Sequence, residues 1–462
     1  MKKNIQAFFE EIKNKKIAFC GLGATNLPVV ELFLKKGAKV LACDITPREK
    51  ANKDILALER LGAELKLGED YLKDLDVDII FRSPGLNFLS AELAEAHRRG
   101  VVVTSEMEVF FALCPCKIIA VTGSDGKTTT TTIISEILKN ARKNVHLGGN
   151  IGKPLLPDIE QIGTEDIVVV ELSSFQLISM RCSPDVAVIT NIEPNHLDVH
   201  KDMNEYICAK KNIFLHQSAF SKTILNFEND ITKNFAKDCR GDVCFFSIHK
   251  PIEKGVSCKD GVIYYEDFQG RVPILNRQDI RLPGEHNLAN YMAAIGAVWG
   301  EVSPQNILNV ARTFNGVEHR MELIREVKGV KYYNDSIATS PTRVTKGMLS
   351  LFDQKIILIS GGYDKKIPFE SLADKIIDKV KILILMGQAA NKIESAVKRS
   401  PKYEVNRPKI LHVDNMEQAV ETAYKLSVPN DIVSLSPACA SFDLYKNFAE
   451  RGNHFKNLVN AL

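Results

Sequence analysis

The chain has 462 residues and a formal net charge of +3, with 45% hydrophobic and 25% charged residues. This length exceeds one ordinary hydrophobic core, so we expect about two to four domains. The balanced charge and the lack of a long basic stripe argue against a nucleic-acid partner. No apolar run approaches the roughly 20 residues of a membrane span, and the N-terminal segment lacks the apolar core of a signal peptide. With 10 scattered cysteines in no zinc-like spacing, we expect a cytoplasmic protein without membrane association.

Residues 16–44 read as a strand, a glycine turn, a helix and a second strand. Gly21 and Gly23 begin a dinucleotide-binding pattern, but Asn26 stands where the third glycine of that pattern belongs. Asp44 ends the second strand, at the position of a ribose-binding acid. NAD is therefore one candidate ligand, and a uridine nucleotide on the same scaffold is favoured by the motifs described below.

Two further strands are expected in this first unit, at residues 77–81 and 101–104. The loop Ser83-Pro84-Gly85 lies just beyond the first of them. Repeated strand–helix units predict a parallel sheet whose ligand crevice lies at the carboxyl ends of the strands. We therefore expect a Rossmann-like domain over residues 1–105.

Residues 117–134, KIIAVTGSDGKTTTTTII, have the layout of a phosphate-binding loop. A buried strand leads into a glycine-rich turn, then Lys127, Thr128 and apolar residues at helical spacing. Glycines let backbone N–H groups converge on phosphate, the lysine reaches the outer phosphates, and the hydroxyl binds Mg²⁺. Because the first glycine of the common motif would fall at Val121, a simple turn with a chance lysine is the alternative. The predicted triphosphate-binding residues are Gly123, Ser124, Asp125, Gly126, Lys127, Thr128 and Thr129.

The next two strands also end in polar side chains. Glu171 follows four apolar residues and is positioned to hold Mg²⁺, although an acid that only marks the strand end is the alternative. The strand DVAVITNIEPNHLD delivers Asn191, His196 and Asp198. Three successive strands thus place polar chemistry at one sheet edge, which favours a metal or phosphate role for His196. Lys210, on the following helix, reads from the pattern alone as an ordinary solvated lysine.

We expect a central domain over residues 106–316, a P-loop ATPase domain with a parallel sheet and a small antiparallel part. Within it, residues 222–281 alternate short strands and turns. Asn287 and Asn290 lie one helical turn apart, which suits two contacts to one ligand, whereas a helix cap explains only one of them. Residues 317–462 again alternate strands and helices and predict a second Rossmann-like domain. Its strand ends carry Asn334, Asp335, Ser336, Thr339, Lys365 and the segment SPACASFDLYKNF.

A triphosphate site flanked by two α/β units predicts two substrates besides ATP. A switch GTPase would need a base-reading motif such as N-K-x-D at the right place, which the sequence lacks. A small-molecule kinase is another candidate, and so is a nucleotide-binding regulatory protein without catalysis. The layout favours carboxylate activation, in which ATP phosphorylates a carboxylate and an amine attacks the acyl phosphate. Arg320 and Lys365 are cations for developing phosphate charge or a substrate carboxylate.

The motifs TGSDGKTT, ELSSFQL, NHLD, GEHN, EHR, NDSIAT, GGYDK and SPACASFDLYKNFAERG together resemble those of the Mur ligases, over essentially the whole chain. GKTT and HR recur in the wider family, including folylpolyglutamate synthase, whereas ELSSFQL and SPACASFD are typical of the D-glutamate-adding member. The resemblance implies a three-domain α/β ligase that uses ATP to join D-glutamate to UDP-N-acetylmuramoyl-L-alanine in peptidoglycan precursor synthesis. It implies two Mg²⁺ ions, with Mn²⁺ as a substitute, and we expect a monomer. A Mur-type ligase for another amino acid, or a folate ligase, is the alternative.

The resemblance also implies roles for residues at matching positions. Lys127 and Thr128 bind phosphates and Mg²⁺, with Glu171 on the first metal, while His196 and a carbamylated Lys210 hold the second. The implied further ATP contacts are Asn287, Asn290, Arg320 and Asp335, the last near the ribose. The implied D-glutamate pocket is Thr339, Lys365, Ser441, Phe442 and Phe448. The implied contacts of the UDP-sugar are Thr25, Asp44 and Gly85 near the uracil nucleotide and Asn150 near the sugar-peptide.

Three positions depart from the family pattern. Ile337 stands where many relatives have lysine, so one phosphate contact is missing and Arg320 or Lys127 is expected to cover it. Asp125 lies in the phosphate loop, where an acid repels phosphate unless its side chain points outward. A Thr-Arg pair after Asp44 is replaced by Ile-Thr, and Arg48 is the candidate substitute for its diphosphate contacts.

Overall fold

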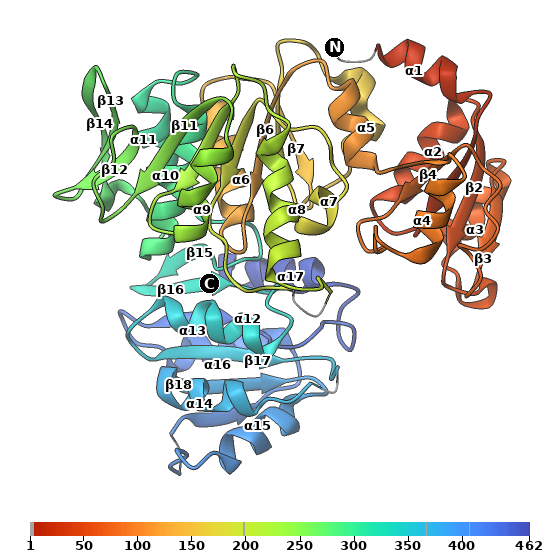
Figure 1. The fold of residues 1–462 in the computed structure, drawn as a ribbon. Coiled ribbons are helices and arrows are strands. Elements are labelled where there is room, and N and C mark those ends of the chain that lie inside the picture. The colour runs from red at the N-terminus through yellow and green to blue at the C-terminus, as the bar shows by residue number, and fades with distance from the viewer. Residues whose placement is uncertain (1–3, 197–198, 366, 406) are drawn as a thin grey trace. The chain divides into compact units, whose positions relative to one another are not determined.

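The structure is a computed structural model that describes residues 4–196, 199–365, 367–405 and 407–462. The chain forms two compact units, one of Met1–Ile280 with Glu285–Arg312 and one of Arg281–Gly284 with Thr313–Leu462. Three sheets are present, coloured red to orange, orange to green, and cyan to blue in Figure 1. The predicted α/β class is confirmed. One sheet falls within each predicted domain range, and the exact limits at residues 105 and 316 stay predictions.

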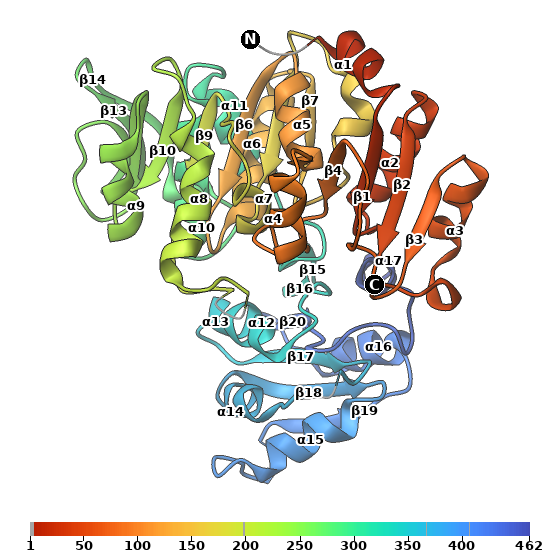
Figure 2. The ribbon, with the colours of Figure 1, turned by 45° about the vertical axis from the view of Figure 1, so that its right-hand side comes forward.

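The N-terminal sheet of the first unit has five parallel strands in the order β3-β2-β1-β4-β5. Figure 2 labels the first four of them in this order. They are β1 (Lys16–Cys20), β2 (Lys39–Asp44), β3 (Glu64–Leu67), β4 (Ile79–Arg82) and β5 (Val102–Thr104). The helices are α1 (Ile5–Ile12), α2 (Asn26–Lys35), α3 (Lys53–Arg60), α4 (Ala91–Arg98) and α5 (Glu106–Leu113). Phe19 of β1 stacks on Phe81 of β4 with ring centroids 4.7 Å apart, and Phe33 of α2 meets both rings edge-on. This core fixes the carboxyl ends of β1 and β4 beside each other.

The central sheet has nine strands in the order β14-β13-β12-β11-β10-β9-β6-β8-β7. They are β6 (Lys117–Thr122), β7 (Val145–Gly149), β8 (Ile167–Glu171), β9 (Val186–Ile189), β10 (Lys222–Asn226), β11 (Asp242–Ser247), β12 (Gly255–Lys259), β13 (Val262–Asp267) and β14 (Gly270–Asn276). The pairs β12–β13 and β13–β14 are antiparallel and the other pairs are parallel, as predicted. The wholly apolar strands IIAV and IVVV are buried on both faces, which is the signature of a covered parallel sheet.

The helices of the central part are α6 (Lys127–Asn140), α7 (Ser174–Leu177), α8 (Met203–Leu215), α9 (Asp230–Asn234), α10 (Glu285–Val298) and α11 (Pro304–Thr313). Short 3₁₀ helices lie between these elements at Leu156–Gln161 and Phe235–Asp238. In this part α6 and α10 pack against each other (Figure 1).

A buried acid on α5 holds the start of the Leu156–Gln161 turn. Glu106 is 2% exposed, and its Oε1 accepts hydrogen bonds from the N–H groups of Leu155 (3.1 Å) and Leu156 (2.9 Å). Burial raises the pKa of Glu106 to about 7, against the smaller lowering effect of these two bonds. The carboxyl group is therefore a titrating group of the fold close to neutral pH.

We expect Glu106→Gln to raise stability above pH 7. A raised folded-state pKa contributes stability that is complete below the unfolded pKa and is lost as pH rises through about 7. Glutamine keeps the accepting oxygen and cannot ionise, so the variant gains up to about 3 kcal/mol over the wild type at pH 8 and little at pH 4. Melting temperatures of both proteins across this pH range measure the effect. Parallel curves for the two proteins would contradict it.

The second unit contains a six-stranded sheet in the order β15-β16-β20-β17-β18-β19. Its strands are β15 (Glu322–Val327), β16 (Val330–Asn334), β17 (Ile356–Gly361), β18 (Val380–Met386), β19 (Lys409–His412) and β20 (Ile432–Leu435). Its helices are α12 (Pro341–Lys346), α13 (Met348–Leu351), α14 (Glu370–Lys379), α15 (Ala390–Arg399), α16 (Met416–Leu426) and α17 (Phe448–Asn460). Two separate hydrophobic clusters form, one containing residues of α12–α15 and the other residues of α16 and α17. Apart from the antiparallel β15–β16 pair, the sheet is parallel, as a Rossmann-like domain requires.

Candidate nucleotide and metal site

The loop between β6 and α6 requires two of its glycines. Gly123 has φ +154°, and a Cβ there would lie 1.9 Å from Thr190 Oγ1. Gly126 has φ +77°, and a Cβ there would lie 2.3 Å from Asn290 Oδ1. Any larger residue would clash with these side chains and strain the backbone. The glycines therefore let β9 and α10 close against the loop.

The side chains around the loop hold its backbone in place. The N–H of Ser124 donates to the Asn191 carbonyl (2.9 Å), and the N–H of Asp125 donates to Asn191 Oδ1 (3.0 Å). Thr190 Oγ1 donates to the Asp125 carbonyl at 2.5 Å. Ser124 Oγ also bonds to Tyr206 OH at 2.9 Å. Asp125 itself is exposed, as an acid in a phosphate loop needs to be.

Lys127 and Thr128 lie in the first turn of α6. Lys127 Nζ donates to the carbonyls of Gly123 (2.9 Å) and Ser124 (2.8 Å), so the ammonium lies over the loop. Thr128 is 7% exposed, and Thr129 is half-buried. The first N–H groups of a helix have no intrahelical partner and favour an anion. The loop, the lysine and the helix end together form an arrangement suited to phosphate.

Glu171 ends β8 directly beside β6, paired in register with Val121. It is 1% exposed, its Oε1 accepts from Asn150 Nδ2 at 2.7 Å, and its Oε2 is buried without a hydrogen-bond partner within the part of the chain that the structure describes. A buried carboxylate oxygen without a donor is costly, and a hard cation is the natural partner for it. These residues fit a Mg²⁺ ion. Asn150 orients this carboxylate, and its contact with the sugar-peptide stays a prediction.

Lys210 is buried, whereas the residue pattern alone predicted a solvated side chain. It is 1% exposed on α8, where Nζ donates to Thr122 Oγ1 (3.1 Å) and the Gly123 carbonyl (2.8 Å). Its ammonium lies 4.9 Å from the centre of the Tyr206 ring. Burial, and secondly the charge of Lys127, hold the pKa of Lys210 well below its ordinary value. The simple expectation of a solvated lysine is therefore wrong.

His196 lies at the exposed end of the loop that follows β9. It has φ +55°, and its ring packs edge-on against Phe175 with centroids 5.1 Å apart. Asp198 lies outside the described residues. Among the residues that the structure describes, no three His, Cys, Asp or Glu side chains form a ready metal cluster. A metal here would therefore need ligands of other kinds, such as a hydroxyl, a phosphate or a modified lysine.

Asn287 and Asn290 lie one turn apart on α10, as predicted, and both are buried. Asn290 Nδ2 donates to Asn287 Oδ1 at 3.3 Å, and Asn290 Oδ1 accepts from Thr130 Oγ1 at 3.2 Å. Asn290 also lies against Gly126. The pair thus supports the phosphate loop, and its contact with ATP stays a prediction.

The predicted uridine site lies at the carboxyl edge of the five-stranded sheet. Both oxygens of Asp44 accept backbone bonds, from Leu22 (2.7 Å) and Thr46 (2.9 Å). Thr25 is half-buried just before α2, and Gly85 is exposed. Arg48, the candidate substitute for diphosphate contacts, pairs with Glu59 at 2.5 Å.

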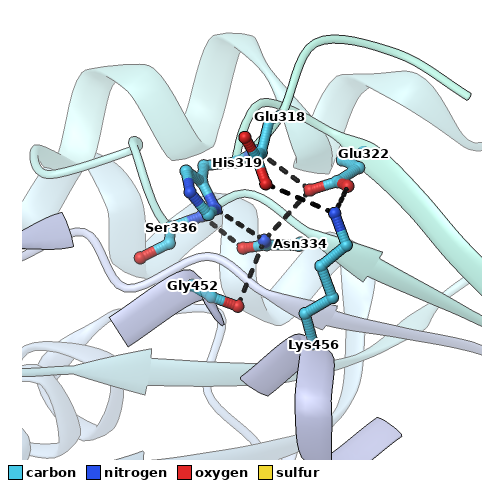
Figure 3. Close-up of polar contacts among 7 residues, drawn as sticks. All are labelled: Glu318, His319, Glu322, Asn334, Ser336, Gly452 and Lys456. Carbon is cyan, nitrogen blue, oxygen red and sulfur yellow. Dashed lines mark hydrogen bonds and ion pairs between the residues drawn. The ribbon is translucent and has the colours of Figure 1, made fainter. Parts of the chain in front are cut away.

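In the second unit a polar network joins the segments EHR and NDS to helix α17 (Figure 3). The His319 N–H donates to Glu322 Oε2 at 3.0 Å, and Asn334 Nδ2 bonds to the same oxygen (3.2 Å) and to His319 Nδ1 (2.9 Å). Lys456 of α17 pairs with Glu322 at 2.5 Å and with Glu318 at 3.4 Å. The network fixes the backbone on either side of Arg320.

Asp335 follows Asn334 and is 3% exposed. Its carboxyl oxygens accept from the Met321 N–H and Ser436 Oγ, both at 3.2 Å, while burial raises its pKa to about 7. Asp335 thus ties the segment after Arg320 to the end of β20. Its predicted place near the ribose stays a prediction.

The residues predicted to form the amino-acid pocket lie on three segments of the second unit. Thr339 is half-buried, Lys365 is exposed, and Ser441 is 2% exposed. Phe442 is 66% exposed and its ring lies 6.2 Å from that of Tyr363. Phe448 begins α17, with its ring edge-on to His319 at 6.0 Å.

Arg451, which the sequence motifs did not single out, holds two of these segments. It is 2% exposed and donates to the carbonyls of Ser336 (2.9 Å), Ala440 (3.1 Å) and Cys439 (3.2 Å). Arg451, Phe455 and Val459 share the buried face of α17. An arginine at helical spacing with apolar residues was the signal in the sequence.

In the described part of the chain, no helix is both long and apolar enough to cross a membrane. Comparison with known proteins gives a consistent result along the chain. The model of the Mur ligase middle domain matches residues 121–298, and that of the Mur ligase glutamate ligase domain matches residues 319–439.

Two curated relatives match over their full length. The chain is 48% identical over 465 residues to the UDP-N-acetylmuramoylalanine–D-glutamate ligase of Acetivibrio thermocellus, covering 100% of both chains. It is also 48% identical over 463 residues to the ligase of the same name from Clostridium botulinum strain Hall, again covering 100% of both. Among solved structures, UDP-N-acetylmuramoylalanyl-D-glutamyl-2,6-diaminopimelate–D-alanyl-D-alanyl ligase from Acinetobacter baumannii matches with a TM-score of 0.57 and 15% identity, covering 100% of this chain and 99% of that one. At this identity the last match shows the fold alone.

Proposed function

Because the chain belongs to the Mur ligase family, we propose that it is the ATP-dependent ligase that adds D-glutamate to UDP-N-acetylmuramoyl-L-alanine in peptidoglycan precursor synthesis. The observation that carries this proposal is the 48% identity, over the whole chain, to relatives named for that activity. The proposal includes a monomeric enzyme in the cytoplasm.

The reaction proceeds through two bond exchanges. The terminal L-alanine carboxylate attacks the γ-phosphorus of ATP, giving an acyl phosphate and ADP. The amine of D-glutamate then attacks the acyl carbon, loses a proton, and the tetrahedral intermediate expels phosphate to leave the amide. Lys127 and the N-terminus of α6 hold the phosphates and offset the repulsion between carboxylate and triphosphate.

The metal-holding residues are divided into two sets in this proposal. Thr128 and Glu171 hold one Mg²⁺, and Glu171 Oε2, buried and without a donor, supports this assignment. His196 and a carbamylated Lys210 hold a second, and the depressed pKa of the Lys210 amine supports its modification. Bound Mg²⁺, or Mn²⁺ in its place, supplies positive charge that neutralises the phosphate oxygens.

The remaining proposed contacts concern the UDP-sugar, ATP and D-glutamate, with the uracil nucleotide and D-glutamate bound to the outer domains. Thr25, Asp44 and Gly85 contact the uracil nucleotide, with Asn150 toward the sugar-peptide. Asn287, Asn290, Arg320 and Asp335 complete the ATP site. D-Glutamate has two carboxylates, so it needs two anion sites, for which the proposed residues are Thr339, Lys365, Ser441, Phe442 and Phe448.

The test is phosphate release from ATP in the presence of UDP-N-acetylmuramoyl-L-alanine and one amino acid. We expect release that requires both the nucleotide substrate and D-glutamate, and none with L-glutamate, L-alanine, L-lysine or diaminopimelate. Release with one of the others would keep the ligase mechanism and overturn the assigned amino acid. Release with none of them would overturn the proposed activity.

A further inference from the structure

Arg82, the last residue of β4, is a buried cation between the N-terminal and central sheets of the first unit. It is 1% exposed. Its Nη2 donates to the Phe175 carbonyl and to Ser179 Oγ, both at 2.8 Å, and its Nη1 lies 3.4 Å from the carbonyls of Ser83 and Leu86. One planar guanidinium therefore contacts two segments that are far apart in the sequence.

The first of these segments is the loop 83–86, which contains Gly85 of the proposed uracil site. The Ser83 N–H donates to the Cys20 carbonyl at 2.9 Å, and the Leu86 N–H donates to the Ser83 carbonyl at 3.1 Å. These bonds place the loop beside the glycine turn that follows β1, at the carboxyl edge of the sheet. Arg82 supports this loop because its side chain contacts the backbone carbonyls of Ser83 and Leu86.

The second segment consists of α7, which begins three residues after Glu171, and of the turn after it, which contains Ser179. Phe175, whose carbonyl Arg82 binds, packs its ring against His196 at 5.1 Å and stacks on His200 at 5.2 Å. Ser174 Oγ bonds to His200 Nε2 at 2.9 Å. A shift of α7 would therefore move the Phe175 ring that supports the side chain of His196, the proposed metal ligand.

The charge of Arg82 is balanced through this same contact. Ser179, which accepts from Arg82, donates its hydroxyl proton to Glu108 Oε2 at 3.0 Å, and Ser105 donates to the same oxygen at 2.8 Å. Burial of a cation is tolerated when its donors are satisfied and an anion lies near. The relay Arg82–Ser179–Glu108 supplies the anion, and Nη1 and Nη2 have acceptors, whereas Nε is buried without a partner among the described residues.

We propose that Arg82 is a positioning residue that holds the loop 83–86, part of the proposed uracil site, in a fixed position relative to α7, the helix that supports His196. The inference rests on the proposed function, because it assigns the loop to the UDP-sugar and His196 to the metal. A guanidinium presents several donors in a rigid plane, so it can hold both segments at once, whereas a lysine ammonium cannot reproduce that geometry. Loss of Arg82 leaves both sites present but misaligned.

The test compares Arg82→Met and Arg82→Lys with the wild type. Misplacement of reacting groups by about 1 Å costs on the order of a hundredfold, so we expect kcat/KM for the UDP-sugar to fall about that much in Arg82→Met. KM for ATP and for D-glutamate should stay at the wild-type values, and Arg82→Lys should recover only part of the loss. Arg181→Met is the matched control, because Arg181 is exposed on the adjacent turn and donates to the neighbouring carbonyls of Ile178 and Met180.

A second readout requires no turnover. Protein with isotope-labelled histidine is titrated with UDP-N-acetylmuramoyl-L-alanine, without ATP, and followed by NMR. The His196 resonance is assigned by its loss in His196→Gln. We expect the substrate to shift this resonance in the wild type and in Arg181→Met, and not in Arg82→Met. Calorimetry on the same samples gives the affinity for the UDP-sugar.

The outcomes separate this inference from the proposed function. A wild type that neither binds nor turns over the UDP-sugar contradicts the proposed function. A wild type that does both, with Arg82→Met showing only a lower melting temperature, unchanged KM and kcat and a normal His196 shift, overturns the role of Arg82. If Arg82→Met does not fold, Ser179→Ala decides, because it removes one partner and should lower kcat/KM for the UDP-sugar in the same direction.

Discussion

Lys127→Ala is expected to lower turnover of ATP about a thousandfold while the protein stays folded, since removing one preorganised charge-stabilising donor costs about 10²–10³ in rate and a lysine adds its full charge. Lys127 Nζ lies within 2.9 Å of two loop carbonyls, directly over the backbone that would receive the phosphates. It is the cation placed to follow negative charge as it moves from the γ-phosphate to the leaving group. Phosphate release under saturating substrates measures the effect.

The fold should tolerate this change. Residue 127 is the first residue of α6, and alanine has the best helix propensity. The loop is held by bonds from Asn191 and Thr190 that do not involve the lysine side chain. The melting temperature should therefore stay close to that of the wild type.

Lys139→Ala provides the matched control on the same helix. Lys139 is exposed in the last turn of α6 and pairs with Glu136 at 2.9 Å. Its loss should change neither turnover nor ATP affinity, because exposed pairs of this kind contribute about 0.5 kcal/mol or less. A Lys127→Ala enzyme with wild-type turnover would contradict the phosphate-loop assignment.

The sequence was informative where chemistry follows directly from a strand end. The segments after β6, β8 and β9 lie at one sheet edge because parallel strands share their direction, so Lys127, Glu171 and His196 could be grouped without coordinates. Asn287 and Asn290 followed equally well from helical spacing. In the first case the shared direction of parallel strands determines the geometry, and in the second case the helical period does.

Contacts between distant segments could not be predicted in this way. Arg82 ends an apolar strand, and nothing near it in the sequence indicates that its partners are Phe175 and Ser179. Lys210 reads as a surface lysine, because its burial depends on α8 packing under the phosphate loop. Tertiary packing determines the environment of such residues, and the local sequence pattern does not indicate which distant segments pack together.

Lys210→Ala is expected to lower turnover by about a hundredfold or more, because loss of a group that only orients a ligand already costs about 10–100-fold and Lys210 is proposed as a ligand itself. A short carboxylate such as acetate should restore part of the turnover. The proposed carbamate forms when the neutral amine attacks CO₂ and loses a proton, which converts a cation into an oxygen ligand. Only the neutral amine can react, and burial lowers the pKa of Lys210, which favours this form. Added acetate supplies the missing carboxylate oxygens in the space vacated by the side chain.

The wild type offers an independent measurement of the same modification. Rigorous removal of CO₂ and bicarbonate should lower turnover, and their return should restore it. The rate should also fall as pH decreases, because protonation of the amine shifts the equilibrium away from the carbamate. Native mass spectrometry should detect one added CO₂ that is absent in Lys210→Ala.

The neighbouring residue is the control for this experiment. Lys211 pairs with Asp238 at 2.7 Å and lies next to Lys210 on the same helix. Lys211→Ala should keep wild-type turnover and the same dependence on CO₂. If Lys210→Ala were equally active, or if neither CO₂ nor acetate affected either protein, Lys210 would act as an unmodified amine. Its two bonds to Thr122 and Gly123 would then be its whole role, as a buried support of the phosphate loop.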